Sequence, residues 1–301
     1  MSHSRTVAVV IPSWNSLELL PRCLDSLTDQ GVEVELMVID NGSDDGSVEL
    51  LERRGVPHLA LPENAGFAAA VNLASARTRA EAVLALNADT VLEPGCLALL
   101  LDALEADPRL GGVQPRLLQL EGDAGAPLDP ATARLYSAGQ ALTADGRAIE
   151  LGAGEEQPPR LPDTHEVFGV CGAACLLRRQ LFAELGGYDE SYFAFYEDVD
   201  LNVRARIAGW RFAYVPEAVV WHLGNASWLA GFERPGAENA RLVARNRLAT
   251  QVKFMPAAAL PRIAAVELGA LVRAATQRRL RSTLAGKLAA LRLLPRLLRE
   301  R

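Results

Sequence analysis

The chain has 301 residues, of which half are hydrophobic, and a formal net charge of −6. This length and composition allow a large buried core and exclude an intrinsically disordered protein. No stretch reaches the roughly 18 unbroken apolar residues of a membrane-spanning helix, and the polar start of the chain lacks the apolar region of a secretory signal, so we expect a protein that is soluble or peripheral to a membrane.

Short β-branched runs alternate with helical patterns over the first hundred residues. The predicted strands are 6–12, 34–40, 58–62 and 82–87, and the predicted helices are 17–27, 47–53, 66–76 and 95–106. This alternation predicts βαβ units and a mainly parallel sheet. Because open α/β sheets bind ligands at the carboxyl ends of their strands, the polar residues that follow these strands are expected to share one functional edge.

The rest of the chain falls into three parts. Residues 111–162 are rich in Gly, Pro and Asp around short strand patterns such as 134–142. We expect a variable, irregular segment there, and its sequence indicates little about function. Strands at 168–177 and 212–221 follow, with a helix at 198–208 between them. From about Glu238 the pattern is helical, with interruptions at Pro256 and Pro261. We therefore predict an α/β domain over 1–237 and a helical C-terminal region over 238–301.

The C-terminal region is cationic. Residues 241–301 contain 14 Lys and Arg against two Glu, whereas residues 1–240 contain 17 basic and 35 acidic side chains. Leucines recur there at helical spacing beside basic residues, which predicts an amphipathic helix. The leucines are Leu284, Leu288, Leu291, Leu294 and Leu298, and the basic residues are Lys287, Arg292, Arg296 and Arg299. The apolar face either covers the α/β domain, packs in a homodimer, or lies on an anionic membrane leaflet. Nucleic acid is a disfavoured partner, because the remainder of the chain is acidic.

The four cysteines show neither a CxxC pair nor a histidine at zinc-finger spacing. They are therefore expected to be buried, reduced thiols, which is typical of a cytoplasmic protein. They are Cys23, Cys96, Cys171 and Cys175.

Polar segments follow each of the first four predicted strands. The first strand leads into Pro12, Trp14 and Asn15 without a GxGxxG motif, which excludes a Rossmann dehydrogenase. The second ends at Asp40, in a loop that either is a turn with Ser43 or Asp44 capping the next helix, or presents a carboxylate to a nucleobase or ribose.

The segments after the third and fourth strands also allow either a structural or a ligand-binding interpretation. The third is followed by Asn64 and Gly66, which either open a helix or line a ligand. The fourth is followed by Asn87 and Asp89, where the carboxylate either caps a helix or holds a metal ion.

Three carboxylates lie within four residues in the segment 196–201, Tyr-Glu-Asp-Val-Asp-Leu. Carboxylates this close oppose one another's ionisation, so they mark either a solvated helix start or a site that needs a carboxylate. The aromatic run at 192–196 is either core or a surface on which sugars stack. Downstream, His222 is either an interior hydrogen-bonded imidazole or a metal ligand.

These ordered motifs, from Val7 to Ser227, resemble family-2 glycosyltransferases. The resemblance implies a GT-A type nucleotide-diphospho-sugar transferase fold, α/β with a mainly parallel sheet flanked by helices. It also implies an inverting, metal-dependent transfer in which a base deprotonates the acceptor hydroxyl. The motifs look most like those of rhamnosyltransferases of cell-envelope polysaccharide assembly, so dTDP-rhamnose is the expected donor.

The resemblance implies a role for each candidate residue. Asp198 is the expected base, and Glu197 orients the acceptor, while Asp200 pairs with Arg204. Asp89 and His222 are expected to hold Mn²⁺ or Mg²⁺. The expected nucleotide-binding residues are Pro12, Asn15, Asp40, Asn64, Gly66 and Asn87. The expected donor and acceptor pocket consists of Trp14, Gly172, Ala173 and Tyr196.

Two alternatives remain open at this point: a UDP-dependent hexosyl- or galactofuranosyltransferase, and a catalytically silent nucleotide-sugar-binding scaffold. Because similar enzymes act on polyprenyl-diphosphate-linked sugars, the resemblance implies peripheral binding to the inner face of the plasma membrane.

Overall fold

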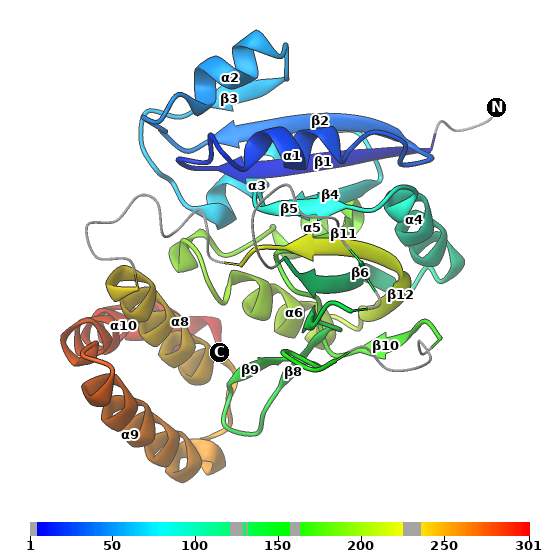
Figure 1. Cartoon of the computed structure of the whole chain (residues 1–301). Helices are drawn as coiled ribbons and strands as arrows, with labels where there is room; N and C mark the ends of the chain where they lie inside the picture. Colours follow the sequence, from blue (N-terminus) through cyan, green and yellow to red (C-terminus); the bar gives the residue numbers. More distant parts are fainter. Residues whose placement is uncertain (1–4, 121–128, 131, 157–162, 225–235) are drawn as a thin grey trace.

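A ten-stranded mixed sheet forms the centre of the structure, a computed structural model that describes residues 5–120, 129–130, 132–156, 163–224 and 236–301 (Figure 1). The strand order is β10-β12-β6-β11-β4-β1-β2-β3, with β5 against β12 and β7 against β6. The strands β3, β2, β1 and β4 are parallel, as are β6 and β12, whereas β11 runs antiparallel between β4 and β6.

The predicted alternation in the first hundred residues is confirmed. The elements are β1 (Thr6–Ser13), α1 (Leu20–Asp25), β2 (Glu33–Asp40), α2 (Ser47–Arg53), β3 (His58–Ala60), α3 (Phe67–Ser75), β4 (Ala82–Leu86), β5 (Thr90–Leu92) and α4 (Cys96–Ala106). In the register of β1 and β2, Ser13 lies opposite Asp40. The polar residues that follow these strands therefore share one edge of the sheet, as expected.

The second half contains the elements that complete the sheet. They are β6 (Leu110–Gln119), β7 (Leu135–Ser137), β8 (Gln140–Leu142), β9 (Ala148–Glu150), β10 (His165–Val167), β11 (Ala174–Arg178), α5 (Arg179–Leu185), the 3₁₀ helix η1 (Glu190–Tyr192), α6 (Glu197–Ile207) and β12 (Arg211–His222). The predicted strand at 134–142 is divided into β7 and β8 around Gly139, whose φ is 114°.

The predicted strand at 168–177 was wrong at its start, because β11 begins only at Ala174. The backbone N–H groups just before it are used by side chains instead of a strand ladder. Cys171 donates to Gln114 Oε1 at 2.6 Å, and Gly172 donates to Asp198 Oδ2 at 2.9 Å. The loop before β11 is therefore shaped by side chains of β6 and α6.

The C-terminal region forms three helices, α8 (Ala237–Phe254), α9 (Leu260–Thr276) and α10 (Leu280–Glu300), with the 3₁₀ helix η2 (Ala257–Ala259) between the first two. The predicted break at Pro261 was wrong: this proline lies in the first turn of α9, where its missing N–H costs nothing. A buried ion pair joins Lys253 Nζ of α8 to Asp200 Oδ1 of α6 at 2.9 Å. The helices thus dock directly on the α/β domain (Figure 1).

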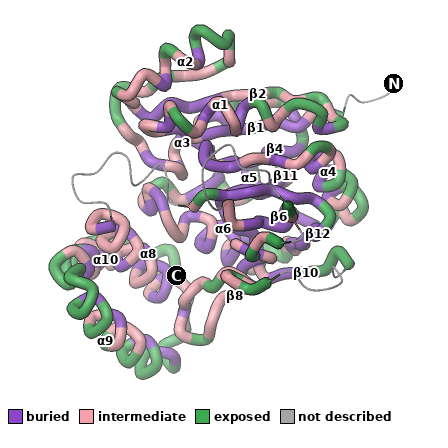
Figure 2. Tube along the Cα trace, in the orientation of Figure 1, coloured by how far each residue is buried: buried purple, intermediate pink, exposed green. Residues whose placement is uncertain are grey.

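Two apolar layers cover the faces of the sheet. One contains residues of α1 and α4, and the other contains residues of α3, α5 and α6. Figure 2 shows the buried residues concentrated along the strands, whereas much of α9 is exposed. All four cysteines are buried and free, as predicted. None of the helices in the described part of the chain combines the length and the hydropathy required to cross a bilayer.

Candidate active site

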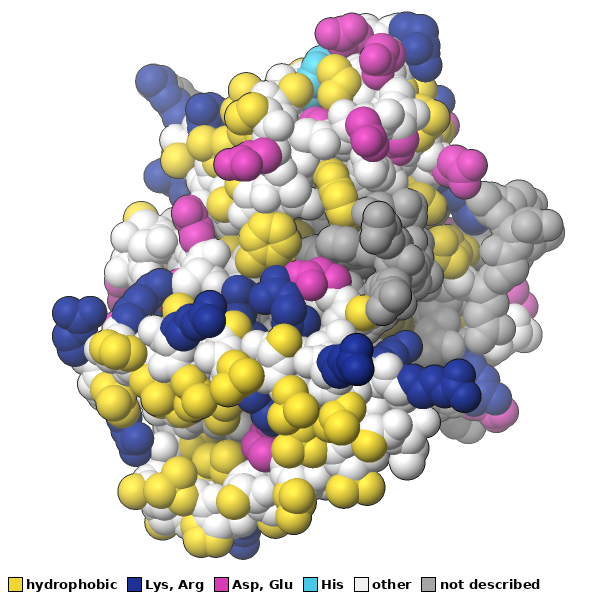
Figure 3. Space-filling model, turned by 90° about the vertical axis from the view of Figure 1, so that its left-hand side faces the viewer, with side chains coloured by type: hydrophobic (Ala, Val, Ile, Leu, Met, Phe, Trp, Pro, Cys, Tyr) yellow, Lys and Arg dark blue, Asp and Glu magenta, His cyan; other side chains and the backbone are white. Residues whose placement is uncertain are grey.

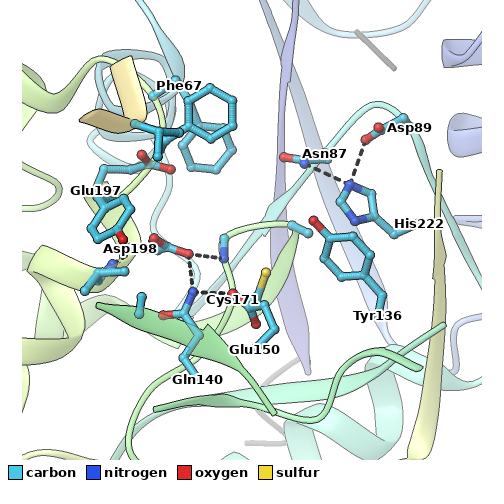
Figure 4. Close-up of a pocket in the computed structure, with 18 residues that line it drawn as sticks. Phe67, Asn87, Asp89, Tyr136, Gln140, Glu150, Cys171, Glu197, Asp198 and His222 are labelled. Carbon is cyan, nitrogen blue, oxygen red and sulfur yellow. Dashed lines mark hydrogen bonds and ion pairs between the residues drawn. The ribbon is translucent and has the colours of Figure 1, made fainter. Parts of the chain in front are cut away.

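A cavity of about 250 Å³ opens at the functional edge of the sheet (Figure 4). Asn87, Asp89 and His222 lie on one side of it, and Glu197 and Asp198 lie on the other. The remaining polar lining comes from segments far apart in the sequence and consists of Tyr136, Gln140 and Glu150. Gly172, Ala173 and Tyr196, predicted for the donor and acceptor pocket, also line this cavity.

Asp89 and His222 converge as predicted. β12 pairs with β5, which places His222 opposite Thr90 and therefore beside Asp89. His222 Nε2 lies 3.2 Å from Asp89 Oδ1 and 3.3 Å from Asn87 Nδ2, and both side chains of the Asp–His pair are almost fully buried. The ring of Tyr136 meets the imidazole edge-to-face at 4.4 Å. The stretch of motifs that resembles the family extends to Ser227, which lies outside the described residues.

This pair fits a divalent cation. Two ligand atoms at right angles on a metal with bonds of roughly 2.1 Å lie about 3 Å apart, which is close to the observed separation. An imidazole nitrogen combined with carboxylate oxygen suits manganese or magnesium. Nδ1 of His222 has no hydrogen-bond partner in the described part of the chain, so the direction of the ring is set by the contacts of Nε2 and by Tyr136.

A second group of ligand atoms lies in the same cavity. One donor atom each of Glu150, Cys171 and Asp198 come within 4.8 Å of one another. Burial raises the pKa of the Cys171 thiol well above its usual value, and the nearby carboxylates raise it further. The thiol is therefore protonated, which makes this trio a poorer manganese site than Asp89 with His222.

Asp198 is held by three donors. Its Oδ2 accepts from Gly172 N at 2.9 Å and from Gln140 Nε2 at 2.7 Å, and its Oδ1 accepts from Val199 N at 2.8 Å. Burial raises the pKa of Asp198, and these hydrogen bonds oppose that rise. The carboxylate is thus fixed in direction while facing the cavity.

The carboxyl group of Glu197 has a less favourable environment for its charge than that of Asp198. Burial, and secondly the charge of Asp198, raise the pKa of Glu197 well above its usual value. Its Oε2 has no hydrogen-bond partner in the described residues, whereas Asp198 has three donors. The negative charge is therefore better stabilised on Asp198 than on Glu197. The predicted pair of Asp200 with Arg204 is confirmed at 2.6 Å.

Gln140 and Glu150 are site residues that the sequence did not reveal. Antiparallel pairing of β8 with β9 places them side by side, and Gln140 Nε2 donates to Glu150 Oε1 at 2.8 Å as well as to Asp198. Burial, and secondly the charge of Asp198, raise the pKa of Glu150 to about 7. The segment expected to hold little function therefore supplies one wall of the cavity.

The turn before α6 has unusual backbone geometry. Phe193, Phe195 and Tyr196 all have φ near +70°, a region that costs a non-glycine residue roughly 1–3 kcal/mol. Phe193 O also occupies the space that a Cβ on Gly66 would need. Gly66 is thus required for close approach of this turn to the loop after β3, in addition to any contact with a nucleotide.

A smaller hollow of about 50 Å³ adjoins the main cavity and shares Phe67 and Asn87 with it. Three other predicted residues, Pro12, Trp14 and Asn64, line this hollow. It lies where the ends of β1 and β4 meet the loop after β3. The structure thus brings Pro12, Asn64 and Asn87, predicted to bind the nucleotide, together with Trp14, predicted for the donor and acceptor pocket.

Asp40 and Asn15 build the loop next to the hollow. Asp40 is fully buried, and its two oxygens accept from Ser43 N at 2.9 Å and Ser43 Oγ at 2.6 Å. Asn15 Oδ1 accepts from Asp44 N at 3.0 Å. The alternative of a cap by Ser43 or Asp44 was wrong, because Asp45 binds Ser47 N instead, at 3.0 Å. Contact of Asp40 with a base stays a prediction.

Comparison with known proteins gives the family. The family model described as glycosyl transferase family 2 matches residues 8–186. An N-acetylglucosaminyl-diphospho-decaprenol L-rhamnosyltransferase of Mycobacterium tuberculosis is 32% identical over 238 residues, which cover 72% of this chain and 74% of that protein. The O-antigen chain rhamnosyltransferase RfbN of Salmonella typhimurium is 27% identical over 232 residues, 76% of this chain and 69% of that protein.

Solved structures show the same fold. GalNAc-T7 with UDP, GalNAc and Mn²⁺ has a TM-score of 0.60 at 17% identity, covering 83% of this chain and 52% of that one. The mannosyltransferase PcManGT of Pyrobaculum calidifontis, in complex with GDP-Man and Mn²⁺, has a TM-score of 0.53 at 17% identity, covering 95% of this chain and 74% of that one. Together with the family match, these findings show that the chain is a glycosyltransferase of family 2 with a GT-A-like fold.

Proposed function

We propose that this enzyme transfers L-rhamnose from dTDP-rhamnose, with inversion, to a sugar of a cell-envelope glycan or of a polyprenyl-diphosphate-linked acceptor. The observation that carries the proposal is that Asp198 faces the Asp89–His222 pair across one cavity. The names of two relatives that match over most of this chain support rhamnose as the sugar.

The chemistry assigned to the chain follows from the charges in the cavity. Asp198 takes the proton of the acceptor hydroxyl as that oxygen attacks the anomeric carbon, and Gln140 and Gly172 hold its carboxylate in place. Asp89 and His222 would hold Mn²⁺ or Mg²⁺, which when bound offsets the charge of the departing diphosphate. In this proposal the raised pKa keeps Glu197 neutral, so that it adds no second negative charge and donates to the acceptor.

The adjoining hollow is assigned to the nucleotide. In this proposal Pro12, Asn64 and Asn87 contact it directly, while Asn15, Asp40 and Gly66 shape the loops around it. Trp14 lies between base and sugar, and Gly172, Ala173 and Tyr196 leave room for the rhamnose beside the metal ligands.

Calorimetric binding of dTDP, UDP and GDP, each with and without Mn²⁺, tests this assignment. We expect dTDP to bind tightest and only with the metal. Tighter binding of UDP would overturn the donor while leaving the family function intact, and absence of binding by all three would overturn the nucleotide site. Transfer of rhamnose from dTDP-rhamnose to a lipid-linked amino sugar is the corresponding activity assay.

We further propose that residues 1–237 form the catalytic domain. We also propose that the cationic face of residues 238–301 docks on an anionic membrane. Figure 3 shows hydrophobic side chains gathered over the C-terminal helices, bordered by Lys and Arg. Seven large apolar side chains there are at least 41% exposed: Leu260, Leu268, Val272, Leu284, Leu288, Leu291 and Leu298. The opposite face of α10 is occupied by α8, so these leucines do not cover the α/β domain. Apolar side chains within a cationic border match an anionic leaflet.

Flotation with phosphatidylcholine vesicles, with and without one quarter phosphatidylglycerol, tests this surface. The intact chain is expected to float only with the anionic vesicles, and combined replacement of Leu284, Leu288 and Leu291 by Ser is expected to lower the bound fraction at least about fivefold. Ile207→Ser, which removes an apolar side chain that is 76% exposed on α6, is the matched control. Equal flotation of the triple variant and the intact chain would refute membrane docking. A dimer in solution that the triple variant makes monomeric would assign the surface to a second copy instead.

A further inference from the structure

One side chain of α8 donates hydrogen bonds to three backbone carbonyls of the turn that precedes α6. Asn246 Nδ2 lies 2.9 Å from Tyr192 O, 2.8 Å from Ala194 O and 2.6 Å from Phe195 O. The side chain is buried, with 1% of its surface exposed. Its two amide hydrogens are therefore shared among three carbonyl oxygens of one short turn.

The neighbouring arginine determines which way this amide points. Arg245 Nε donates to Asn246 Oδ1 at 2.7 Å, and Arg245 Nη2 donates to Ser191 O and Tyr192 O at 3.0 and 2.6 Å. Because the oxygen of the amide accepts from Arg245, its nitrogen must face the carbonyls. Only a donor satisfies that position.

The same turn requires an external restraint. Phe193, with φ 66° and ψ −65°, forms a tight turn in which Ala194 N donates to Tyr192 O at 2.7 Å, and Phe195 and Tyr196 are also left-handed. Such conformations persist only where surrounding contacts enforce them. On the catalytic-domain side, Ala68 N donates to Phe193 O at 3.2 Å. From the C-terminal side, the restraint comes from α8.

This turn forms part of the cavity and leads into Asp198. Ala194, Phe195 and Tyr196 line the cavity, and Tyr196 is the residue from which α6 begins. A change in the path of the turn therefore moves both the cavity wall and the first turn of α6. Misplacement of a catalytic group by about 1 Å is enough to lower a rate about 100-fold.

We propose that Asn246 is a positioning residue of the active site, which holds Phe193, Phe195 and Tyr196 in their positive-φ conformations and thereby fixes the direction of Asp198. The inference rests on the proposed function in giving Asp198 the role of base. It makes α8 a part of the catalytic unit, although the sequence places this helix in a separate cationic region. The boundary at residue 237 thus separates two regions of different charge that share one site.

The test compares two near-isosteric variants on the same helix. Asn246→Asp replaces the donor with a carboxylate oxygen facing the three carbonyls, while Arg245 remains in place to pair with the new charge. Gln251→Glu is the matched control: Gln251 is 2% exposed on α8, and its Nε2 donates at 2.9 Å to the carbonyl of Asp145, outside the turn. Both variants thus lose a buried amide donor and gain a buried carboxyl group.

We expect Asn246→Asp to lower kcat for rhamnosyl transfer about 100-fold, with the affinity for dTDP unchanged, and Gln251→Glu to keep kcat within about threefold of the intact enzyme at a comparable loss of melting temperature. Amide hydrogen exchange of residues 193–199 is expected to accelerate in Asn246→Asp alone. Equal losses of kcat in both variants, or an unchanged kcat in Asn246→Asp, would overturn the positioning role.

The exchange measurement separates this inference from the proposed function. If the intact enzyme transfers no rhamnose, the proposed function fails, and exchange then decides the inference alone. Unchanged exchange over residues 193–199 in Asn246→Asp would overturn it, and selective acceleration would support it.

Discussion

Replacing Asp198 with Asn is expected to lower kcat for sugar transfer by about 10²–10⁴-fold, the usual contribution of a general base, while the affinity for dTDP with Mn²⁺ stays unchanged. The amide cannot accept the proton of the acceptor hydroxyl. It also cannot satisfy Gly172 N–H and Val199 N–H at the same time, because its nitrogen would face one of these donors. Steady-state transfer and calorimetry on the same preparation give the two quantities.

The control for this variant is Asp200→Asn. Asp200 is on the same helix and fully buried, but it pairs with Arg204 and Lys253 and does not line the cavity. We expect a lower melting temperature for Asp200→Asn with turnover retained by the folded protein. If Asp198→Asn retained most of its turnover, Asp198 would not be the base.

The intact enzyme should become faster as the pH rises. A base must be deprotonated to act, and burial raises the pKa of Asp198, so kcat is expected to rise with pH through the titration of that carboxyl group. In Asp198→Asn this rise is expected to disappear from the residual rate.

Local signals explain why one half of the site could be predicted from the sequence. Asp40 is the last residue of β2, and Asn87 and Asp89 follow β4. Parallel strands place their carboxyl ends on one edge, so the adjacency of these residues follows from the alternation of strands and helices alone. Asp198 was found because its neighbours Glu197 and Asp200 make an uncommon concentration of charge. In each case the pattern lies within a few residues of the functional group.

The other half depends on contacts between distant segments. Gln140 and Glu150 are ordinary polar residues in a Gly- and Pro-rich stretch, and only the pairing of β8 with β9 brings them to Asp198. Similarly, Asn246 lies within a basic helix that gives no sign of the turn at 192–196. No periodicity or spacing encodes such pairs, because each is selected by tertiary packing.

The backbone conformation of the turn at 192–196 could not be predicted from the sequence either. Its aromatic residues suggest a core or a sugar-stacking surface, and bulky residues do not favour positive φ. The conformation is instead enforced by the carbonyl contacts from Asn246 and by the close approach of Phe193 to Gly66. The family resemblance predicts a nucleotide contact for Gly66, and the structure gives it a steric role as well.

Loss of either Asp89 or His222 is expected to weaken Mn²⁺ binding in the presence of dTDP at least about 100-fold, because even residues that only orient a ligand contribute 10–100-fold to metal affinity. Asp89→Asn removes the negative charge of one of the two groups that lie 3.2 Å apart, and His222→Ala removes the other group. Since both groups serve one ion, the double variant should lose little more than either single variant. Titration of Mn²⁺ by electron paramagnetic resonance measures the affinity directly and does not require turnover.

Glu150→Gln is the decisive comparison for the position of the metal. Glu150 belongs to the second group of ligand atoms, with Cys171 and Asp198, in the same cavity. If the ion binds at Asp89 and His222, Glu150→Gln keeps its Mn²⁺ affinity. Loss of Mn²⁺ affinity in Glu150→Gln, together with retention of that affinity in Asp89→Asn, would show that the ion binds on the opposite side of the cavity. Asp198 would then be a metal ligand, and its assignment as the base would fall with the same result.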